Sequence, residues 1–353
     1  MIDSARRARR ARIEPLLESA RAIADPASPF GRRARERLIS STGLSAQGVN
    51  FALERCLECR PSEAELTALI DSTAPSAQAH VLLSANVFVA AHRALALALA
   101  SAPTVTVRPS RREPEMAELL LEGAPESFQL KPELSPAAGD QLWAYGSDDT
   151  LRALAERLPP GVVLHAHGSG FGIAVLDRQP SDTELAGLLP KLAEEVALFD
   201  QRGCLSPRVL LLTGSPEFAR EVAQALAVEL SALETRIPRG HLDPEEAAEI
   251  TAYRDTASYA GEIFSAGLGF VSAGTSSVFL LPPVGRNLHV LPTSDLLGSI
   301  SGFSSLVTTC AVAGSAELAD TLRRTLIGVR CCDFGHMQTP PFDGPVDRRA
   351  RRF

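Results

Sequence analysis

From about residue 80 onward, short apolar runs alternate with longer segments of helical pattern, and this alternation limits the fold more than any other sequence feature. The runs HVLLSANVF (80–88) and TVTVRPS (104–110) are mostly apolar at first and end at turn-forming residues, as buried strands do. Each is followed by a segment typical of a helix, AHRALALALASA (91–102) and EPEMAELLLEGA (113–124). A repeated order of strand and helix predicts an α/β protein with a parallel sheet.

The length of the chain and its changes of pattern predict several domains. A chain of 353 residues is too long for one ordinary core. Its first part shows only helical spacing, whereas strands and helices alternate in the rest. We therefore expect an N-terminal helical region (1–72), a first α/β domain (73–198), a second α/β domain (199–330) and an irregular C-terminal tail (331–353).

Charge and composition disfavour several classes of function. The formal net charge is −7, and a general nucleic-acid binder is usually basic. No apolar run is long enough to span a membrane, and the first residues lack the apolar core of a secretion signal, so we expect no membrane insertion and a cytoplasmic location. Two arginine clusters, at 6–12 and 348–352, are predicted to be solvated tails, with weak contact to an anionic partner as the alternative.

The stretch FDQRGCLSPR (199–208) holds a cysteine in an unusual setting. Cys204 lies on a turn marked by Gly203 and Pro207, just before a strongly apolar run. A single cysteine is often no more than a small buried hydrophobic residue. On a turn that presents backbone N–H groups it can instead be held as a thiolate, and Arg202 can add positive potential. Cys204 is therefore a candidate nucleophile, and its own N–H is a candidate oxyanion donor.

Polar residues follow three other predicted strands, and ligands of open α/β sheets bind at the carboxyl ends of strands. Asn86 is either a helix cap or an amide donor aimed at a carbonyl oxygen. The Arg-Pro-Ser turn at 108–110 holds either an exposed arginine or a group that meets a ribose hydroxyl or a 2′-phosphate. Gly146 and Ser147 form either a capped tight turn or a set of N–H groups that face a cofactor.

Several other motifs are incomplete or absent from the sequence. HAHGSGFG (165–172) has two glycines of a dinucleotide fingerprint, but Ile173 stands in place of the third. The two histidines of that stretch lack a third ligand, and CLEC (56–59) does not combine with the pair Cys331–Cys332 into a zinc set, so we expect no metal. No G-x-S-x-G elbow and no P-loop occurs, which disfavours an α/β-hydrolase.

Taken together, these segments resemble the aldehyde dehydrogenase superfamily, and within it the LuxC-type fatty acyl-CoA and acyl-protein thioester reductases. SANVF through RPS (84–110) is similar to the superfamily's Asn-bearing strand end, apolar helix and Lys-Pro-Ser turn. FDQRGCLSPR is the most specific match, because the family's nucleophile lies in a nearly identical stretch. WAYGSDDT (143–150) resembles the turn beside the nicotinamide, and MQTPPFDGPVD (337–347) resembles the C-terminal segment.

The resemblance implies a fold, an activity and roles for individual residues. It makes 73–198 a Rossmann-type NAD(P)-binding domain and 199–330 a catalytic α/β domain that carries the nucleophilic cysteine. It implies NADPH-dependent reduction of a fatty acyl thioester to an aldehyde through an acyl-cysteine, with NADH as the alternative cofactor. The implied site residues are Cys204 and Asn86 for catalysis, and Arg108, Pro109, Ser110, Gly146 and Ser147 for cofactor binding.

The resemblance also bears on water, partners and alternatives. Hydrolytic aldehyde dehydrogenases activate water with a glutamate in the stretch that matches HAHGSGFG, but no Glu or Asp occurs from 161 to 176. We expect a long-chain acyl-CoA or an acylated carrier or partner protein as the substrate, and a homo-oligomer. Two alternatives stay open: a non-catalytic scaffold with this fold, and an acylating aldehyde dehydrogenase that acts on other acyl groups.

Overall fold

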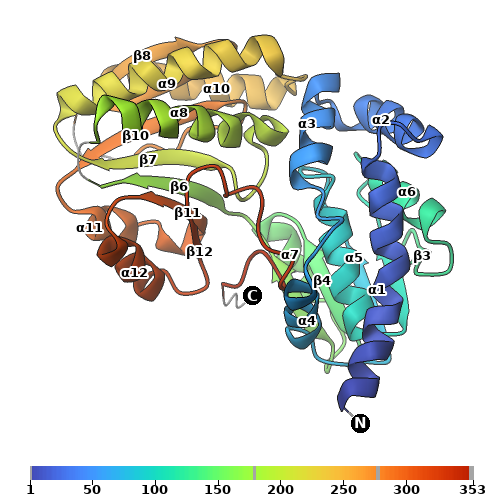
Figure 1. Cartoon of the computed structure of the whole chain (residues 1–353). Helices are drawn as coiled ribbons and strands as arrows, with labels where there is room; N and C mark the ends of the chain where they lie inside the picture. Colours follow the sequence, from blue (N-terminus) through green and yellow to red (C-terminus); the bar gives the residue numbers. More distant parts are fainter. Residues whose placement is uncertain (1, 178–179, 276–278, 350–353) are drawn as a thin grey trace.

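Two mainly parallel sheets with helices packed on them make up the molecule (Figure 1), which confirms the predicted α/β class. The computed structural model describes residues 2–177, 180–275 and 279–349. The strands are β1 (Gln78–Leu82), β2 (Thr104–Arg108), β3 (Gln129–Leu130), β4 (Gln141–Tyr145), β5 (Val163–His167), β6 (Phe171–Leu176), β7 (Pro207–Thr213), β8 (Gly261–Ala266), β9 (Gly269–Gly274), β10 (Asn287–Thr293), β11 (Val307–Ala313) and β12 (Arg330–Cys332). The helices are α1 (Ile2–Ala24), α2 (Pro29–Thr42), α3 (Ala46–Cys56), α4 (Glu63–Asp71), α5 (Ala90–Ser101), α6 (Glu115–Gly123), α7 (Asp148–Ala155), α8 (Asp182–Ala197), α9 (Pro216–Arg236), α10 (Pro244–Ala260), α11 (Leu296–Ser301) and α12 (Ala316–Thr325).

The first sheet has the order β3-β2-β1-β4-β5, and all its strand pairs are parallel. Helix α5 is buried from Ala91 to Ser101, which explains why its sequence is apolar on every face. The N-terminal helices pack on this unit, because α1 contacts both α5 and α6 and shares their hydrophobic core. The helical region at 1–72 is therefore joined to the first sheet rather than separate from it.

The second sheet has the order β12-β11-β6-β7-β10-β9-β8, and only the β8–β9 pair is antiparallel. Helices α8 and α9 pack on one face of the sheet, and α11 and α12 lie on the other (Figure 1). Strand β6 belongs to this sheet, although it precedes the domain boundary expected at 198. The chain passes from one sheet to the other at residues 168–170, so the glycine loop, not the cysteine turn, joins them.

The N-terminal arginine cluster is not a solvated tail, and that prediction was wrong. Arg9 donates to the carbonyls of Ala100, Ile70 and Thr73 at 2.5, 2.7 and 2.7 Å, and Arg12 donates to Leu99 at 2.7 Å. The last carbonyls of a helix have no intrahelical partner, and arginine side chains satisfy them here at the ends of α4 and α5.

The arginines at the other end of the chain also make ordered contacts. Arg348 and Arg349 bond to the nearby Asp343 and Asp347, and Arg351 and Arg352 lie outside the described residues. Arg349 also donates to the carbonyls of Ser305 and Ser169 at 2.7 and 3.3 Å, so it fastens the C-terminal end to distant parts of the fold, as the arginines of α1 fasten that helix.

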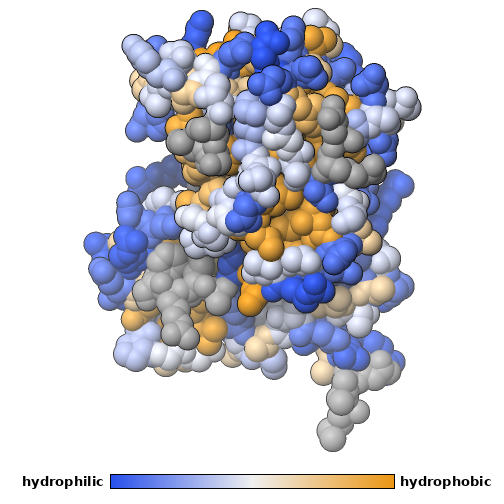
Figure 2. All heavy atoms as spheres, turned by 90° about the vertical axis from the view of Figure 1, so that its left-hand side faces the viewer, coloured by the Kyte–Doolittle hydropathy of each residue, from blue (hydrophilic) through white to orange (hydrophobic). Residues whose placement is uncertain are grey.

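The outer face of the second unit carries a hydrophobic area bordered by hydrophilic residues (Figure 2). Such an area marks a candidate contact surface. Among the described residues, no helix combines the length and the apolar character that crossing a membrane requires.

Candidate active site

A cleft of about 620 Å³ lies between the two sheets. One wall comes from residues that follow β1, β2, β4 and β5, at the carboxyl ends of the first sheet. The opposite wall comes from residues just before β7 and β10, at the amino ends of strands in the second sheet. Ligands of open α/β sheets bind in this position. Cys204, Asn86, Ser110, Gly146 and Ser147 all line the cleft, so the structure brings five of the seven predicted site residues together.

The chain approaches Cys204 through three consecutive residues with left-handed backbone. Phe199, Asp200 and Gln201 have φ angles of 55°, 49° and 67°, and all three are buried. This conformation costs an L-residue roughly 1–2 kcal/mol. Strained backbone of this kind persists only where the surroundings fix it, and it collects at functional sites.

The side chain of Gln201 holds one part of this turn. Its Nε2 donates to the carbonyls of Pro207 and Asn287 at 2.7 and 2.5 Å, and its Oε1 accepts from the N–H of Asn287 at 2.8 Å. The side-chain amide of Gln201 thus both donates and accepts, as a backbone peptide group does, and it links the start of β7 to the start of β10. Because these three bonds are buried, they offset much of the cost of the left-handed backbone.

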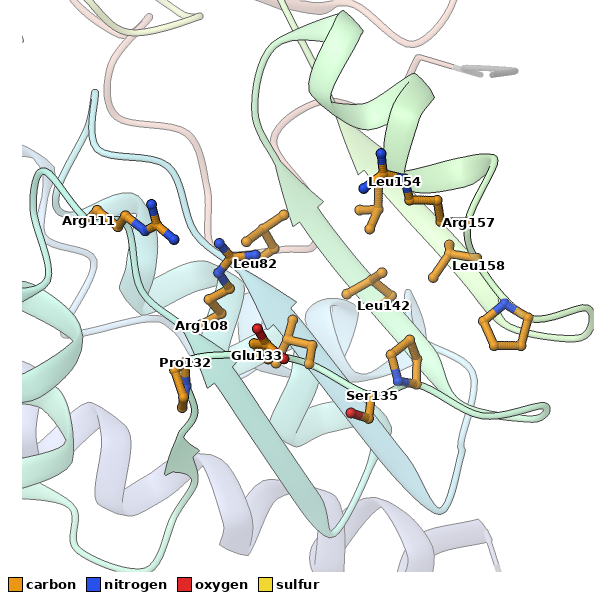
Figure 3. A pocket seen from close by; sticks show the side chains of 13 residues that line it. Leu82, Arg108, Arg111, Pro132, Glu133, Ser135, Leu142, Leu154, Arg157 and Leu158 are labelled. Carbon is orange, nitrogen blue, oxygen red and sulfur yellow. The ribbon is translucent and has the colours of Figure 1, made fainter.

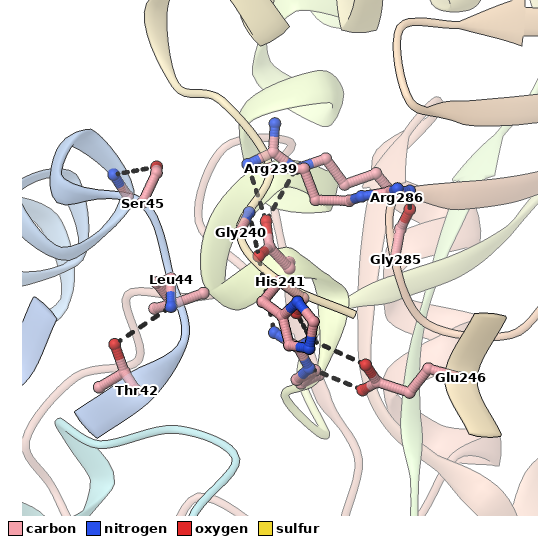
Figure 4. A network of polar contacts seen from close by, with 12 residues as sticks. Thr42, Leu44, Ser45, Arg239, Gly240, His241, Glu246, Gly285 and Arg286 are labelled. Carbon is pink, nitrogen blue, oxygen red and sulfur yellow. Dashed lines mark hydrogen bonds and ion pairs between the residues drawn. The ribbon is translucent and has the colours of Figure 1, made fainter. Parts of the chain in front are cut away.

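Asp200 holds the other part through a buried ion pair. Its carboxylate lies 2.8 Å from Nη2 of Arg286, and it accepts from the N–H of Gly240 at 2.9 Å. Gly240 must be glycine, because a Cβ there would lie 2.1 Å from the carbonyl oxygen of Gly43. His241 in turn donates its N–H to the carbonyl of Gly43 at 2.8 Å. Figure 4 shows Gly240 and His241 with Thr42, Leu44 and Ser45 of the facing loop. The turn is therefore tied both to the second unit and to the loop between α2 and α3.

Arg202 lies on the wall of the cleft, but carboxylates compensate its charge. Nε and Nη2 donate to the two carboxylate oxygens of Glu246 at 2.7 and 2.8 Å, and Nη2 also donates to the carbonyl of His241 at 2.6 Å. The hydrogen bond that Arg202 donates to Glu246 raises the pKa of Arg202. The positive potential expected beside Cys204 is therefore reduced, and the guanidinium is bonded to Glu246.

Cys204 and Asn86 face the same cleft from different units. Cys204 is half-buried, and its carbonyl accepts from the hydroxyl of Thr308. The Oδ1 of Asn86 accepts from Nη2 of Arg112 at 3.1 Å, so its Nδ2 is the end that can donate to a ligand. A thiol and an amide donor are thus available to one bound carbonyl group.

The turn after β4 has a structural role that the sequence left open. Ser147 is the N-cap of α7 and accepts from the N–H of Thr150 at 3.3 Å, and the N–H of Gly146 donates to the carbonyl of His167 at 3.2 Å. These bonds set the shape of the turn at the cleft wall. Both residues line the cleft, but the N–H of Gly146 is already bonded to protein.

Arg108 lies in a neighbouring groove instead of the cleft, and Pro109 lines neither. This groove contains Arg108, Arg111 and Arg157, with Glu133 and the apolar side chains of Leu82 and Leu142 (Figure 3). Two arginines at the carboxyl end of β2 and a third that follows α7 make a groove that suits an anionic group. The groove opens at the same edge of the sheet as the cleft, because Arg108 and Ser110 belong to one turn.

Of the two histidines of β5, only His167 lines the cleft. The rings of Tyr145 and His167 stack with centroids 4.6 Å apart. The ring of His165 stacks on Trp143 at 3.9 Å, and its Nε2 lies 3.0 Å from Oε1 of Gln141. Burial lowers the pKa of His165. Any proton transfer in the cleft by one of these histidines would fall to His167.

The sequence interpretation missed Arg93 and its contacts with the C-terminal segment (residues 333–349). Arg93 is 4% exposed and donates to the carbonyls of Pro340, Pro341 and Gly344 at 3.0, 2.8 and 2.7 Å. It also pairs with Glu58. An arginine inside an otherwise apolar helix was the available signal, because a buried charge needs several partners.

Glu195 holds the C-terminal segment against the cysteine turn. Its carboxylate accepts from the N–H groups of Met337 and Gln338 at 3.1 and 2.9 Å. The Nε2 of Gln338 donates to Oγ of Ser206 at 2.8 Å, and the N–H of Ser206 donates to the carbonyl of Gly203 at 3.0 Å. Burial raises the pKa of Glu195 to about 7. Bonds from α8 thus reach the residue that precedes Cys204.

The part of the chain that the structure describes contains no group of three or more His, Cys, Asp or Glu side chains placed to hold a metal ion. The polar groups that line the cleft include the amide of Asn86, serine hydroxyls, the thiol of Cys204, and arginines and carboxylates that are paired with opposite charges. This chemistry suits an organic ligand with a carbonyl group.

Comparison with known proteins supplies a family and a fold. A sequence model of the family described as acyl-CoA reductase (LuxC) matches residues 70–347. No curated protein matches the chain. The family match covers the first sheet, the cysteine turn, the second sheet and most of the C-terminal segment.

Several solved structures share the architecture. The NAD-dependent aldehyde dehydrogenase from Sinorhizobium meliloti has a TM-score of 0.65 at 16% identity over 91% of this chain and 73% of that one. The salicylaldehyde dehydrogenase from Pseudomonas putida G7 has a TM-score of 0.65 at 14% identity over 97% and 79%. The gamma-glutamyl-gamma-aminobutyraldehyde dehydrogenase from Burkholderia cenocepacia J2315 has a TM-score of 0.62 at 15% identity over 94% and 79%. The fold is that of aldehyde dehydrogenases, as predicted.

Proposed function

The chain belongs to the acyl-CoA reductase (LuxC) family, and from this premise we propose that it reduces an acyl thioester to an aldehyde through an acyl group on Cys204. The observation that carries the proposal is the position of Cys204. The thiol lies in the cleft between the sheets, at the end of a turn that buried bonds hold in a strained conformation. A nucleophile must be held within about 3–3.5 Å of the atom it attacks, and a fixed turn serves that need.

The oxyanion of the attacked thioester needs donors on the side of the carbonyl oxygen. We assign this role to Nδ2 of Asn86 and to the backbone N–H of Cys204. Arg112 supports Asn86, because its bond to Oδ1 turns the other end of the amide toward a ligand. One such donor contributes about 3–4 kcal/mol to transition-state stabilisation. The thiol of the substrate then leaves, and the acyl group stays on Cys204.

The acyl group on Cys204 must survive until it is reduced, which requires that water is not activated. Among the described residues that line the cleft, the carboxylates are those of Glu58 and Asp347. Glu58 is paired with Arg93, and Asp347 is paired with Arg349. Burial raises the pKa of Glu58, Arg93 acts against that shift, and the carboxyl group is bonded to the arginine. Among the described lining residues, the cleft therefore offers water no carboxylate outside an arginine pair, and His167 is the group left to move a proton.

A nicotinamide cofactor fits the donor groups beside the cleft, and we propose NADPH. The arginine-lined groove would hold the adenosine end, with Arg108, Arg111 and Arg157 near a 2′-phosphate and Leu82 beside the base. Ser110 and Ser147 would lie along the path from this groove to Cys204. When bound, the reduced nicotinamide supplies the hydride that turns the acyl group into an aldehyde. Glu133 in the same groove is the one group that opposes a phosphate.

The proposal is tested by product analysis with purified protein. Long-chain acyl-CoA and NADPH are mixed with the protein, and loss of NADPH and formation of the aldehyde are measured together. We expect both with the wild type and neither with Cys204→Ala. NADH is run in parallel, and an acylated carrier protein replaces acyl-CoA in a second series. Binding of NADPH without aldehyde from either thioester would contradict the proposal and favour the non-catalytic alternative.

A further inference from the structure

Three cysteines lie close together on the outer strands of the second sheet, away from the cleft. Cys310 is on β11 and is fully buried, and Cys331 and Cys332 are half-buried on β12. Strand β12 is the edge strand and runs parallel to β11, with Cys310 directly paired to Cys331. None of the six cysteines, all of which the structure describes, forms a disulfide.

The geometry of the sheet brings the side chains of Cys310 and Cys331 together. Paired residues on neighbouring strands point to the same face, and neighbouring strands lie about 4.8 Å apart. This spacing falls in the Cα–Cα range of disulfides, about 4.4–6.8 Å. Both side chains pack in the same hydrophobic cluster, and each thiol shifts the pKa of the other. Cys332 points to the opposite face, where its Sγ lies 3.9 Å from Oγ1 of Thr309.

We propose that Cys310 and Cys331 are an oxidative modification site, at which a hydroperoxide converts the thiol pair into a reversible intrachain disulfide. This site is separate from the thioester chemistry of Cys204. It takes a small peroxide as its co-reactant, which reaches the edge strand from solvent.

The two thiols have different parts in this reaction. The neighbouring thiol of Cys310 lowers the pKa of Cys331, and Arg323 acts in the same direction. The neighbouring Cys331 and burial raise the pKa of Cys310. Cys331 is therefore the thiolate that attacks the peroxide, since the thiolate is the nucleophile and Cys331 is the more exposed of the two.

The steps balance in atoms and electrons. The Cys331 sulfur takes one oxygen of hydrogen peroxide and becomes a sulfenic acid, and the other oxygen leaves as water. The Cys310 sulfur then attacks the sulfur of the sulfenic acid, the S–S bond forms, and a second water leaves with the Cys310 proton. The two thiols lose two electrons in total, and the peroxide gains them. Because β12 is the edge strand, a small thiol can reach the bond and reduce it.

The site has a direct connection to the cleft. Strand β12 leads into the C-terminal segment, whose Gln338 bonds to Ser206 in the cysteine turn. A disulfide would fasten the start of that segment to β11. Oxidation would thereby restrict the segment that lines the cleft, without using Cys204.

The test uses the full chain as the Cys204→Ala variant, so that the cleft thiol cannot react. The folded protein is treated with hydrogen peroxide, remaining thiols are alkylated, and the tryptic peptides are analysed by mass. Trypsin separates the two cysteines, because Arg323 and Arg330 lie between them. We expect one major linked pair, Cys310 with Cys331, with a mass two hydrogens below the sum of its peptides, and its loss after dithiothreitol.

Matched variants decide between the cysteines. Cys332→Ser should keep the linked pair, and Cys331→Ser should abolish it. Protein unfolded in urea should lose the selectivity and give mixed pairs, which controls for random oxidation. A main product that links Cys332, or a sulfinic acid at Cys331 with no link to Cys310, would overturn the proposal. Neither outcome depends on whether the protein reduces thioesters.

Discussion

The cysteine turn lines the cleft, the carboxyl edge of the first sheet borders both the cleft and the neighbouring groove, and the two regions are built differently. In the turn, Asp200 and Gln201 are buried, and their side chains bond to backbone and arginine groups far away in the sequence. At the edge of the first sheet, Arg108 is half-buried, and Ser147 is exposed and bonds within its own turn. The cysteine turn is held by bonds to residues far away in the sequence, whereas the edge of the first sheet is held by bonds between near neighbours in the sequence.

This difference indicates that the position of the Cys204 sulfur must be fixed more accurately than the groups at the edge of the first sheet. A sulfur that attacks a carbonyl loses rate when it shifts by a fraction of an ångström, so its support must be rigid. A dinucleotide contacts many groups, and charge acts over a longer distance than a covalent step. If this interpretation is right, changes behind the turn will cost stability and reactivity together, whereas changes at the edge will alter cofactor binding alone.

The largest effect is expected from Arg286→Leu. Arg286 is buried and pairs with both Asp200 and Glu234. Its loss removes the nearest cation from the buried carboxylate of Asp200 and leaves Nη1 of Arg202 at 3.6 Å, which should lower the free energy of unfolding by about 3 kcal/mol. Urea unfolding measures this change, and the rate of Cys204 alkylation by iodoacetamide reports on the turn.

The matched control is Arg220→Leu, which breaks the exposed ion pair with Glu262. It should cost less than about 1 kcal/mol and leave the alkylation rate unchanged. If the two substitutions changed the unfolding free energy and the alkylation rate equally, the turn would be no more dependent on its buried bonds than an exposed surface is.

The next effect is a pH dependence from Glu195. Its folded pKa is raised to about 7 by burial, although Arg55 and Arg330 oppose the shift and Cys56 and Cys332 lie near it. A raised pKa means that the folded state binds the proton more tightly, so stability is present at low pH and is lost as pH rises toward 7.

Glu195→Gln should remove this dependence. The difference in unfolding free energy between wild type and variant should therefore change by up to about 3 kcal/mol between pH 4.5 and pH 7.5. At the higher pH the wild type should be less stable, relative to the variant, than it is at pH 4.5. Urea unfolding at a series of pH values measures it. Parallel pH curves for the two proteins would show that Glu195 does not titrate in this range.

The smallest effect is expected from Arg157→Gln at the cofactor side. The loss of one positive charge beside a 2′-phosphate should weaken NADPH binding roughly tenfold, with little change for NADH. Fluorescence titration of both cofactors measures the ratio. Arg152→Gln is the control, because Arg152 is exposed on α7 and pairs with Asp149 outside the groove. A loss of NADH affinity as large as that of NADPH would assign Arg157 another role.

The sequence predicted most elements of the fold, because strands and helices of this chain have clear periodicity. It placed Cys204, Asn86, Ser110, Gly146 and Ser147 in one site, and the structure brings them to one cleft. It did not predict the strained turn, because Phe and Gln carry no local preference for left-handed backbone. That conformation depends on bonds from Arg286 and Asn287, far along the chain.

Other features needed the tertiary structure for the same reason. Strand patterns do not say which sheet a strand joins, so the passage between sheets at 168–170 was missed in favour of a boundary at 198. The tail at 331–353 was expected to be irregular, and most of its described part is. Its contacts with Arg93 and Glu195 join buried charged side chains to backbone groups of the tail that are far away in the sequence, so the sequence alone did not predict them.

The proposed function requires that Cys204, held by its turn, forms a thioester with the acyl group of the substrate. The most direct measurement is the intact mass of the protein after incubation with long-chain acyl-CoA in the absence of cofactor. The account predicts one added acyl group on the wild type, located at Cys204 by peptide mapping, and none on Cys204→Ala. An unmodified wild type with acyl-CoA of several chain lengths and with an acylated carrier protein, or an equal adduct on the variant, would contradict it.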